Sequence, residues 1–416
     1  MSAASFRFVH ASDFHLERLP TGLAEIPDRW RDRLVSAAYD AARGVFDTAL
    51  AEDAQFLILA GDILDADGTG PRGPLFLTEQ FTRLAERNIA VYWAGGRTDP
   101  QDAWPAEFEL PENVHVFRRG RVDEIVHRRD GVPIARLIGA GYDRRRKVRP
   151  IDFEPDVAGL FSIAVIHAPG GVSAESLSGR GIHYWALGGS HNRQTMLGGD
   201  ERAHYPGTPQ GQRFGEPGGH GATVVRTDES LQAQLSETAT DGFRWAEVQV
   251  DIGDARTREP LENAILEQAT QLIDTCEGRD LIVRLTLLGD GEALIAIARQ
   301  HLDTAILAWL RESFAGDSPG LWCDSIKLQC REMPAQWYAQ ETIRGDFLRI
   351  TERLGDDREA PIDLARHLAD AVAKNHPAMA DLLLADIDGD ANERWRLIHD
   401  ATLLGANLLT GKDLVS

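Results

Sequence analysis

The chain alternates between continuous apolar runs and stretches in which apolar residues recur every three or four positions. Residues 6–11 and 56–60 are short apolar runs, typical of strands that are covered on both faces. Between them, the apolar positions of 28–51 recur at helical spacing. A second helix is predicted over 75–87 and a third strand over 89–93. This alternation predicts an α/β sheet with functional residues on the loops beyond its strand ends.

After residue 113 the pattern changes to short strands separated by turn residues. Two sheets lying face to face, with helices outside, are the simplest architecture for this pattern. The predicted strands are 114–118, 124–128, 132–139, 162–167, 184–187 and 222–227.

A polar stretch, 228–242, is predicted to be a linker. Beyond it, strands and helices alternate again, including one helix predicted over 292–314, which indicates a small second α/β domain. The rest is mostly helical. The predicted division is therefore a first domain at 1–235, a small α/β domain at 243–335, and a helical C-terminal region at 336–416.

Composition places the chain among ordinary globular proteins, since 43% of its 416 residues are apolar. No apolar run reaches the roughly 20 residues of a membrane span, and no basic and apolar leader opens the chain, so we expect no membrane association. The three cysteines form no close pair, which is typical of a reduced cytoplasm and excludes a thiolate zinc site. A net charge of −21 argues against a protein that holds DNA unaided.

One segment is basic, in contrast to the acidic net charge of the whole chain. Residues 118–149 contain eleven Arg or Lys residues and four Asp or Glu residues. Two interpretations remain open: a solvated hairpin face, or an edge that contacts the phosphates of DNA.

Polar residues with metal-binding side chains follow the predicted strands. Asp13 and His15 follow the first strand, Asp62 follows the second, and His191 follows a later one. Oxygen and imidazole donors on rigid strand ends are what a pair of divalent ions needs to cleave a phosphodiester. The alternative is that these are ordinary loop residues, but their shared position after apolar strands favours a metal centre.

Two sequence motifs resemble those of a known protein family. Residues 8–16, Phe-Val-His-Ala-Ser-Asp-Phe-His-Leu, resemble the opening motif of the calcineurin-like metallophosphoesterases, and within them the bacterial SbcD/YhaO DNA repair exonucleases. Residues 205–211, followed by 214–216, are similar to the loop that closes the phosphoesterase domain in that group. The resemblance covers about 6–227. It implies a four-layer sandwich of two β-sheets flanked by helices, with a small α/β capping domain and a helical C-terminus.

The resemblance also implies ligands. The first metal would be held by Asp13, His15, Asp62 and His191, with Asp62 bridging to a second metal that His167 would also bind. His10 is expected to pack or hydrogen-bond beneath the site rather than to bind metal. Manganese is the expected ion, with iron or zinc as alternatives, because sites of this donor type accept all three.

The chain departs from the family at the second metal. The family motif Gly-Asn-His-Asp aligns with 96–99, so Arg97 replaces an asparagine ligand and Thr98 replaces the histidine that assists the leaving group. Gly189 replaces another ligand of the same ion. We therefore expect no second metal. Arg97 is expected to neutralise Asp62 and, with Asp99, to face a substrate phosphate, although it could instead turn outward.

Two functions remain open on this basis. The first is a weakened, one-metal phosphodiesterase or exonuclease. The second is a catalytically inactive scaffold or nucleic-acid-binding subunit. In both, the resemblance implies a coiled-coil ATPase partner of the SbcC or YhaN kind, and the basic residues of 118–149 are the candidate contact with DNA.

Overall fold

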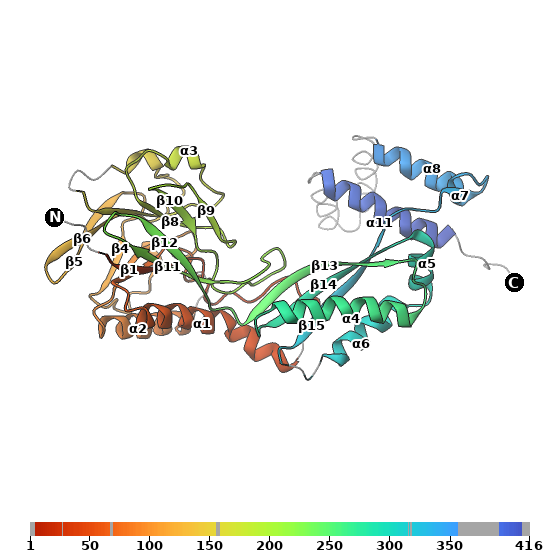
Figure 1. Ribbon diagram of the computed structural model, residues 1–416, viewed down its shortest axis with the longest axis horizontal. Helices are drawn as coiled ribbons and strands as arrows, with labels where there is room; N and C mark the ends of the chain where they lie inside the picture. The colour runs from red at the N-terminus through yellow and green to blue at the C-terminus, as the bar shows by residue number, and fades with distance from the viewer. Residues whose placement is uncertain are drawn as a thin grey trace. The chain divides into compact units, whose positions relative to one another are not determined.

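The computed structural model describes residues 5–26, 28–66, 70–154, 159–314, 316, 318–356 and 391–409 (Figure 1). The chain forms two compact units. The first comprises Met1–Ala246, Cys276–Ile282 and Ser318–Gly320, and the second comprises Glu247–Thr275, Val283–Asp317 and Leu321–Ser416. The three-part division expected from the sequence stays a prediction.

The first unit contains a six-stranded sheet whose centre is parallel. Strands β1, β2, β3 and β4 run parallel, with β1 and β2 in register from Phe8↔Phe56 to Ala11↔Leu59. The carboxyl ends of these strands therefore meet at one edge. The strand order is β12 (Ala233–Ala239), β11 (Gly221–Thr227), β1 (Arg7–Ala11), β2 (Phe56–Leu59), β3 (Ala90–Ala94) and β4 (Val114–Phe117).

A second six-stranded sheet faces the first. Strands β6, β7, β8 and β10 run parallel, so the ends of β7 and β8 also lie at one edge. The strand order is β5 (Asp123–Arg129), β6 (Val132–Ala140), β7 (Phe161–His167), β8 (Tyr184–Gly188), β10 (Arg202–Tyr205) and β9 (Gln194–Met196).

The two sheets and their helices form four layers, as expected. Helices α1 (Asp28–Ala51) and α2 (Arg72–Ala85) cover the outer face of the first sheet, while α3 (Ala174–Leu177) lies beyond the second (Figure 1). Alternate residues of β1 explain the layering: Val9 packs towards α1, and Phe8 packs between the sheets against Phe56. The aromatic core between the sheets fixes their separation.

The predicted linker is wrong in one respect. Residues 233–239 form strand β12, which pairs antiparallel with β11 from Gly221↔Ala239 to Thr227↔Ala233. This strand lies at the edge of the sheet and only one of its seven residues is buried, so its sequence lacks the apolar signal of a core strand.

Most of the second unit is built on a three-stranded sheet. Its order is β13 (Phe243–Gly253), β14 (Asp280–Gly289) and β15 (Leu321–Cys330). Helix α4 (Arg258–Thr275) accompanies this sheet. The single helix expected over 292–314 is two helices, α5 (Gly291–Arg299) and α6 (Leu302–Ser313), because His301 between them has a left-handed backbone with φ of 53°.

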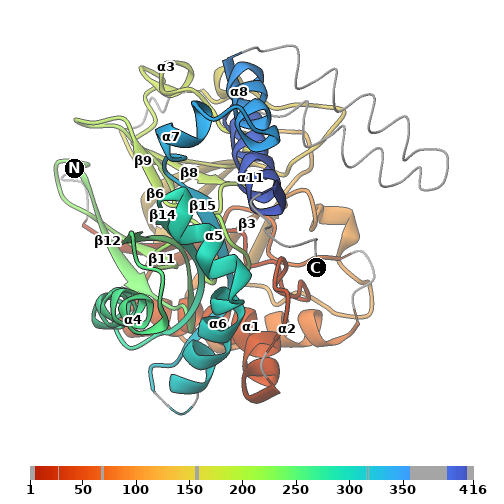
Figure 2. The ribbon, with the colours of Figure 1, turned by 90° about the vertical axis from the view of Figure 1, so that its right-hand side faces the viewer.

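Three further helices follow: α7 (Ala335–Tyr338), α8 (Ile343–Asp356) and α11 (Ala391–Leu409). Figure 2 shows α8 and α11 side by side. The expected helical C-terminus is thus present in the described residues, and 357–390 and 410–416 lie outside them. In the part of the chain that the structure describes, every helix is too short or too polar to cross a membrane.

Candidate metal centre

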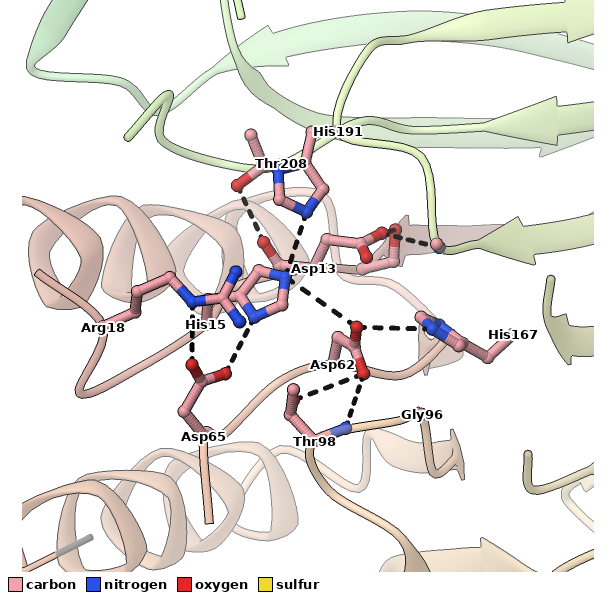
Figure 3. Close-up of polar contacts among 12 residues, drawn as sticks. Asp13, His15, Arg18, Asp62, Asp65, Gly96, Thr98, His167, His191 and Thr208 are labelled. Carbon is pink, nitrogen blue, oxygen red and sulfur yellow. Dashed lines mark hydrogen bonds and ion pairs between the residues drawn. The ribbon is translucent and has the colours of Figure 1, made fainter. Parts of the chain in front are cut away.

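The predicted ligands come together at the strand ends of the first unit. Asp13 and His15 follow β1, Asp62 follows β2, His167 ends β7, and His191 follows β8. Their donor atoms form two groups, each within 4.8 Å: Asp13, His15 and His191 in one, and Asp13, Asp62 and His167 in the other (Figure 3). Asp13 belongs to both groups.

In the first group, the imidazoles of His15 and His191 face each other. His15 Nε2 and His191 Nε2 are 3.0 Å apart. On the far side of each ring, Nδ1 meets a carboxylate: Asp65 Oδ1 at 2.8 Å from His15, and Glu216 Oε1 at 2.6 Å from His191. A carboxylate fixes Nδ1 as the N–H donor, so the Nε2 lone pairs point at each other. Two lone pairs this close repel, and a bound cation would relieve that repulsion.

Asp13 and His167 each carry a buried donor atom turned towards the same region. Asp13 Oδ2 accepts hydrogen bonds from Ser12 Oγ at 2.6 Å and Gly189 N at 2.9 Å. Asp13 Oδ1 and His167 Nε2 are buried with no hydrogen-bond partner. Such atoms are costly unless something binds them. Together with the imidazole pair, they fit a divalent ion, and Asp13, His15, Asp62 and His191 are the residues that would hold it.

Asp62 forms an ion pair with His167. His167 Nε2 lies 3.4 Å from Asp62 Oδ2, while its Nδ1–H donates to the carbonyl of Ala60 at 3.0 Å. Burial alone would lower the pKa of His167, but the Asp62 carboxylate outweighs it and raises that pKa to about 9. Burial likewise opposes the charge on Asp62, and His167 nevertheless holds the pKa of Asp62 well below its usual range.

Thr98 lies against Asp62 rather than in open space. Its backbone N–H donates to Asp62 Oδ1 at 2.9 Å, and its hydroxyl lies 3.3 Å from the same oxygen (Figure 3). A threonine therefore occupies the position that the sequence aligns with the family's catalytic histidine, and it orients the Asp62 carboxylate. Its hydroxyl is no substitute for an imidazole as a general acid near neutral pH.

Arg97 does not neutralise Asp62, and this corrects the expectation from the sequence. Its side chain is exposed, and it has no hydrogen-bond or ion-pair partner among the described residues. The positive neighbour of Asp62 is His167 instead. Gly96 explains the difference, because a Cβ atom there would lie 2.3 Å from Asp62. The loop backbone itself packs on the carboxylate, so the next side chain points away.

Asp99 is a structural residue and does not face a substrate, which is a second correction. It is 5% exposed. Its oxygens accept four N–H groups at 2.7–3.0 Å, from the backbone of Asp62, Ile63 and Gly96 and from the indole of Trp93. Burial, reinforced by the charge of Asp62, raises the pKa of Asp99 to about 7. Asp99 thus joins the two loops that carry Asp62 and Thr98.

Gly189 leaves no open cavity where the family has a ligand. Its φ is +97°, and a Cβ atom there would lie 2.6 Å from the backbone nitrogen of Pro169. A side chain at this position would be strained and would collide with the loop after β7. The backbone N–H of Gly189 instead donates to Asp13.

Three ligand residues themselves have left-handed backbones. The φ angles are 56° for Asp13, 46° for His15 and 53° for Asp62. Each such residue costs about 1–2 kcal/mol relative to ordinary backbone. Strain of this kind collects at functional sites, where the surrounding structure holds it in place.

His10 lies beneath the centre and does not join it. It is fully buried, and its Nδ1 lies 2.9 Å from the hydroxyl of Tyr184. Burial, together with the nearby His204 and Arg193, holds the pKa of His10 well below its ordinary value. This agrees with the structural role expected for it.

The basic segment divides into a paired part and a free part. Arg118, Arg119 and Arg136 form ion pairs with neighbouring acids. In contrast, the exposed side chains of 144–147, Arg-Arg-Arg-Lys, have no hydrogen-bond or ion-pair partner among the described residues. This loop follows Tyr142, whose N–H donates to Gly95 O at 2.8 Å and whose ring lies 5.8 Å from that of His167. The unpaired cations of 144–147 therefore start two residues after Tyr142, whose ring contacts His167 of the centre.

Sequence reasoning missed the two carboxylates behind the histidines. Asp65 lies three residues after Asp62, and Glu216 stands in the 214–216 motif that carried the resemblance. A search for acids flanking each ligand motif would have proposed both. Their pairing with His15 and His191 depends on contacts across 50 and 25 residues of sequence, which spacing does not reveal.

Comparisons with known proteins agree with this geometry. The family described as metallophosphoesterase YhaO, middle domain, matches residues 245–331. The chain is 28% identical over 328 residues to the uncharacterized metallophosphoesterase YhaO of Bacillus subtilis, covering 76% of this chain and 79% of that protein.

Two solved structures are also similar. A dimetal phosphatase from Danio rerio is 10% identical, with a TM-score of 0.34, over 56% of this chain and 98% of that one. A predicted phosphoesterase from Streptococcus pneumoniae is 13% identical, with a TM-score of 0.26, over 57% of this chain and 98% of that one. Likenesses this distant carry no conclusion about the site. The chain is thus similar to the metallophosphoesterase YhaO over most of its length, and its two facing sheets carry a donor cluster at their strand ends.

Proposed function

We propose that this chain is a metal-dependent phosphodiesterase whose chemistry is centred on the first-metal site. The observation that carries the proposal is the His15–His191 pair, with the two Nε2 atoms 3.0 Å apart and a carboxylate behind each ring. A divalent ion at such ligands acts as a Lewis acid towards a phosphoryl oxygen. Asp13 and Asp62 complete an oxygen and nitrogen donor set, for which manganese is the first candidate and iron or zinc the alternatives.

The second-metal site is proposed to be degenerate. Asp62, His167 and the free Oδ1 of Asp13 are the donors on that side. Gly189, Arg97 and Thr98 stand where the family has further functional groups, and the backbone at Gly189 excludes a side chain. One firmly held ion per chain is therefore expected, with weakened turnover, since Thr98 lacks the proton-transfer role of a histidine, worth about 10²–10⁴-fold.

Nucleic acid is the proposed substrate class, as in the SbcD-like DNA repair exonucleases that the sequence resembles. Supporting it are the unpaired cations of 144–147 and the exposed Arg97, which lies two residues after Gly95, the partner of Tyr142. Unpaired cations beside the centre provide the local positive potential that phosphate contacts need on an acidic protein. A cytoplasmic location is proposed with this, consistent with three buried cysteines that form no disulfide.

The test is turnover of bis-p-nitrophenyl phosphate and of a DNA duplex end with Mn²⁺, alongside the Asp62→Ala variant. Hydrolysis that disappears in the variant supports the proposal. Equal signals from both proteins would mean that the activity belongs to a contaminant and that the chain is not catalytic. Metal analysis of the same samples should give about one ion per chain in the wild type.

A scaffold function is the second candidate, and the C-terminal helices favour it. Five large apolar side chains on α8 and α11 are exposed: Ile343 at 76%, Ile350 at 51%, Leu404 at 61%, Leu408 at 73% and Leu409 at 40%. Apolar surface of this kind marks a site for a protein partner. We propose a coiled-coil ATPase of the SbcC or YhaN kind as that partner, with or without catalysis. Co-purification with such an ATPase, lost in Leu404→Asp, would support the docking, while unchanged recovery of the variant complex would exclude it.

A further inference from the structure

The carboxylates behind the two metal-facing histidines are each held by an arginine. Arg18 Nε donates to Asp65 Oδ2 at 2.8 Å, and Arg213 Nε donates to Glu216 Oε1 at 2.7 Å. The same unit, histidine then carboxylate then arginine, thus occurs on both sides of the His15–His191 pair. The two units come from different loops, one from those after β1 and β2 and the other from those after β8 and β10.

Each arginine uses only part of its guanidinium for this contact. In the part of the chain that the structure describes, the terminal amino groups Nη1 and Nη2 of Arg18 and Arg213 have no hydrogen-bond or ion-pair partner. The side chains are 34% and 60% exposed, respectively. An arginine offers five N–H donors in a planar fork, which suits a phosphate oxygen pair. Four donors per side chain therefore remain available to a ligand.

The charge of the centre shows why a substrate anion needs them. Four carboxylates lie in it, and one divalent ion neutralises only half of their charge. The balance therefore stays negative, and a phosphodiester would be repelled. The two positive charges of Arg18 and Arg213 offset this balance. The four carboxylates are those of Asp13, Asp62, Asp65 and Glu216.

We propose that Arg18 and Arg213 form a phosphate clamp that flanks the first-metal site, and this inference rests on the proposed function. The inward Nε–H of each arginine orients the carboxylate behind a ligand histidine. The outward amino groups bind non-bridging oxygens of the substrate phosphate and hold it over the centre. These two side chains are thus positioning residues for the metal ligands and binding residues for the anion.

The test uses Arg18→Gln and Arg213→Gln in the full-length, Mn²⁺-loaded protein, with inorganic phosphate as the probe. Glutamine keeps an N–H donor for the carboxylate but removes the charge and the fork. Phosphate binding, measured by calorimetry, should weaken about 10- to 100-fold in each variant, the range for a hydrogen bond to a charged group. Affinity for Mn²⁺ should change less than about threefold. Arg43→Gln is the matched control, because Arg43 pairs with one carboxylate, Asp40, on helix α1.

Three results are decisive. Phosphate affinity equal to that of the Arg43→Gln control would overturn the clamp. A parallel loss of Mn²⁺ and phosphate affinity would also overturn it, since the arginines would then act only through the metal ligands. Arginine-dependent phosphate binding without any turnover of bis-p-nitrophenyl phosphate would keep the clamp and remove the proposed phosphodiesterase function.

Discussion

The two halves of the metal centre, one around His15 and His191 and the other around Asp62 and His167, differ in the contacts that support their ligands. In the first half, His15 and His191 face each other, and every contact behind them is made, through Asp65 and Glu216. In the second half, His167 meets Asp62, but the aligned position Gly189 has only a backbone. There, Asp62, His167 and Asp13 are the donors, while the backbone N–H groups of Thr98 and Gly189 donate to Asp62 and Asp13.

The difference centres on Asp62. This carboxylate is buried, so its charge needs partners within the protein. Hydrogen bonds from Thr98 and the ion pair with His167 meet this need. The compensation comes from residues around Asp62, and the exposed Arg97 takes no part in it.

The largest expected effect comes from removing one histidine from each half. His15→Ala should weaken Mn²⁺ binding by more than about 100-fold, because it removes a ligand whose supporting carboxylate alone is worth about 10–100-fold. His167→Ala should weaken it by less than about tenfold. Calorimetric titration with Mn²⁺ measures both. Equal losses in the two variants would show that the halves share one ion equally and that the comparison is mistaken.

A smaller loss of Mn²⁺ affinity is expected when the carboxylates that hold His15 and His191 are replaced. Asp65→Asn and Glu216→Gln should each reduce Mn²⁺ affinity about 10–100-fold, because an amide holds the imidazole tautomer less firmly and lowers its basicity. Asp47→Asn is a suitable control, since Asp47 pairs with Arg83 on the outer helices. Affinities indistinguishable from that control would mean that the two acids do not support the ligands.

The smallest effect concerns the backbone of the second half. Gly189→Ala should lower the free energy of unfolding by about 1–3 kcal/mol, because it combines a left-handed backbone with a collision against Pro169. Gly198→Ala is the control: that glycine lacks a left-handed φ and has open space around it. Urea unfolding of the metal-free proteins compares them. A stable Gly189→Ala variant would show that a family-type ligand could return to this position.

Much of the fold follows from local pattern, and the exceptions have physical causes. Helix α1 has the bounds that its apolar spacing predicts, and its apolar face packs in the core with the first sheet from Ala38 to Ala49. Strand β12 escaped prediction because an edge strand needs no apolar face. The break at His301 depends on one left-handed residue inside an apolar pattern that continues past it.

The ligands that directly follow strands could be predicted from the sequence. The directions in which loop side chains point could not. Asp13, His15, Asp62, His167 and His191 were all proposed from motifs, and the structure brings them together. Arg97 and Asp99 were misjudged for the same reason: sequence alignment gives their position but not the side to which a loop turns its side chains. Gly96 and the four N–H groups around Asp99 determine that, and all are tertiary contacts.

The left-handed turns at the ligands have a consequence for how an ion is acquired. Backbone hydrogen bonds hold them: Asp13 N–H donates to Gly61 O at 2.9 Å, and His15 N–H to Asp62 O at 3.0 Å. These turns are fixed by main-chain contacts, so binding of an ion should require little rearrangement of the main chain. The main chain around the ligands is therefore already arranged for binding an ion.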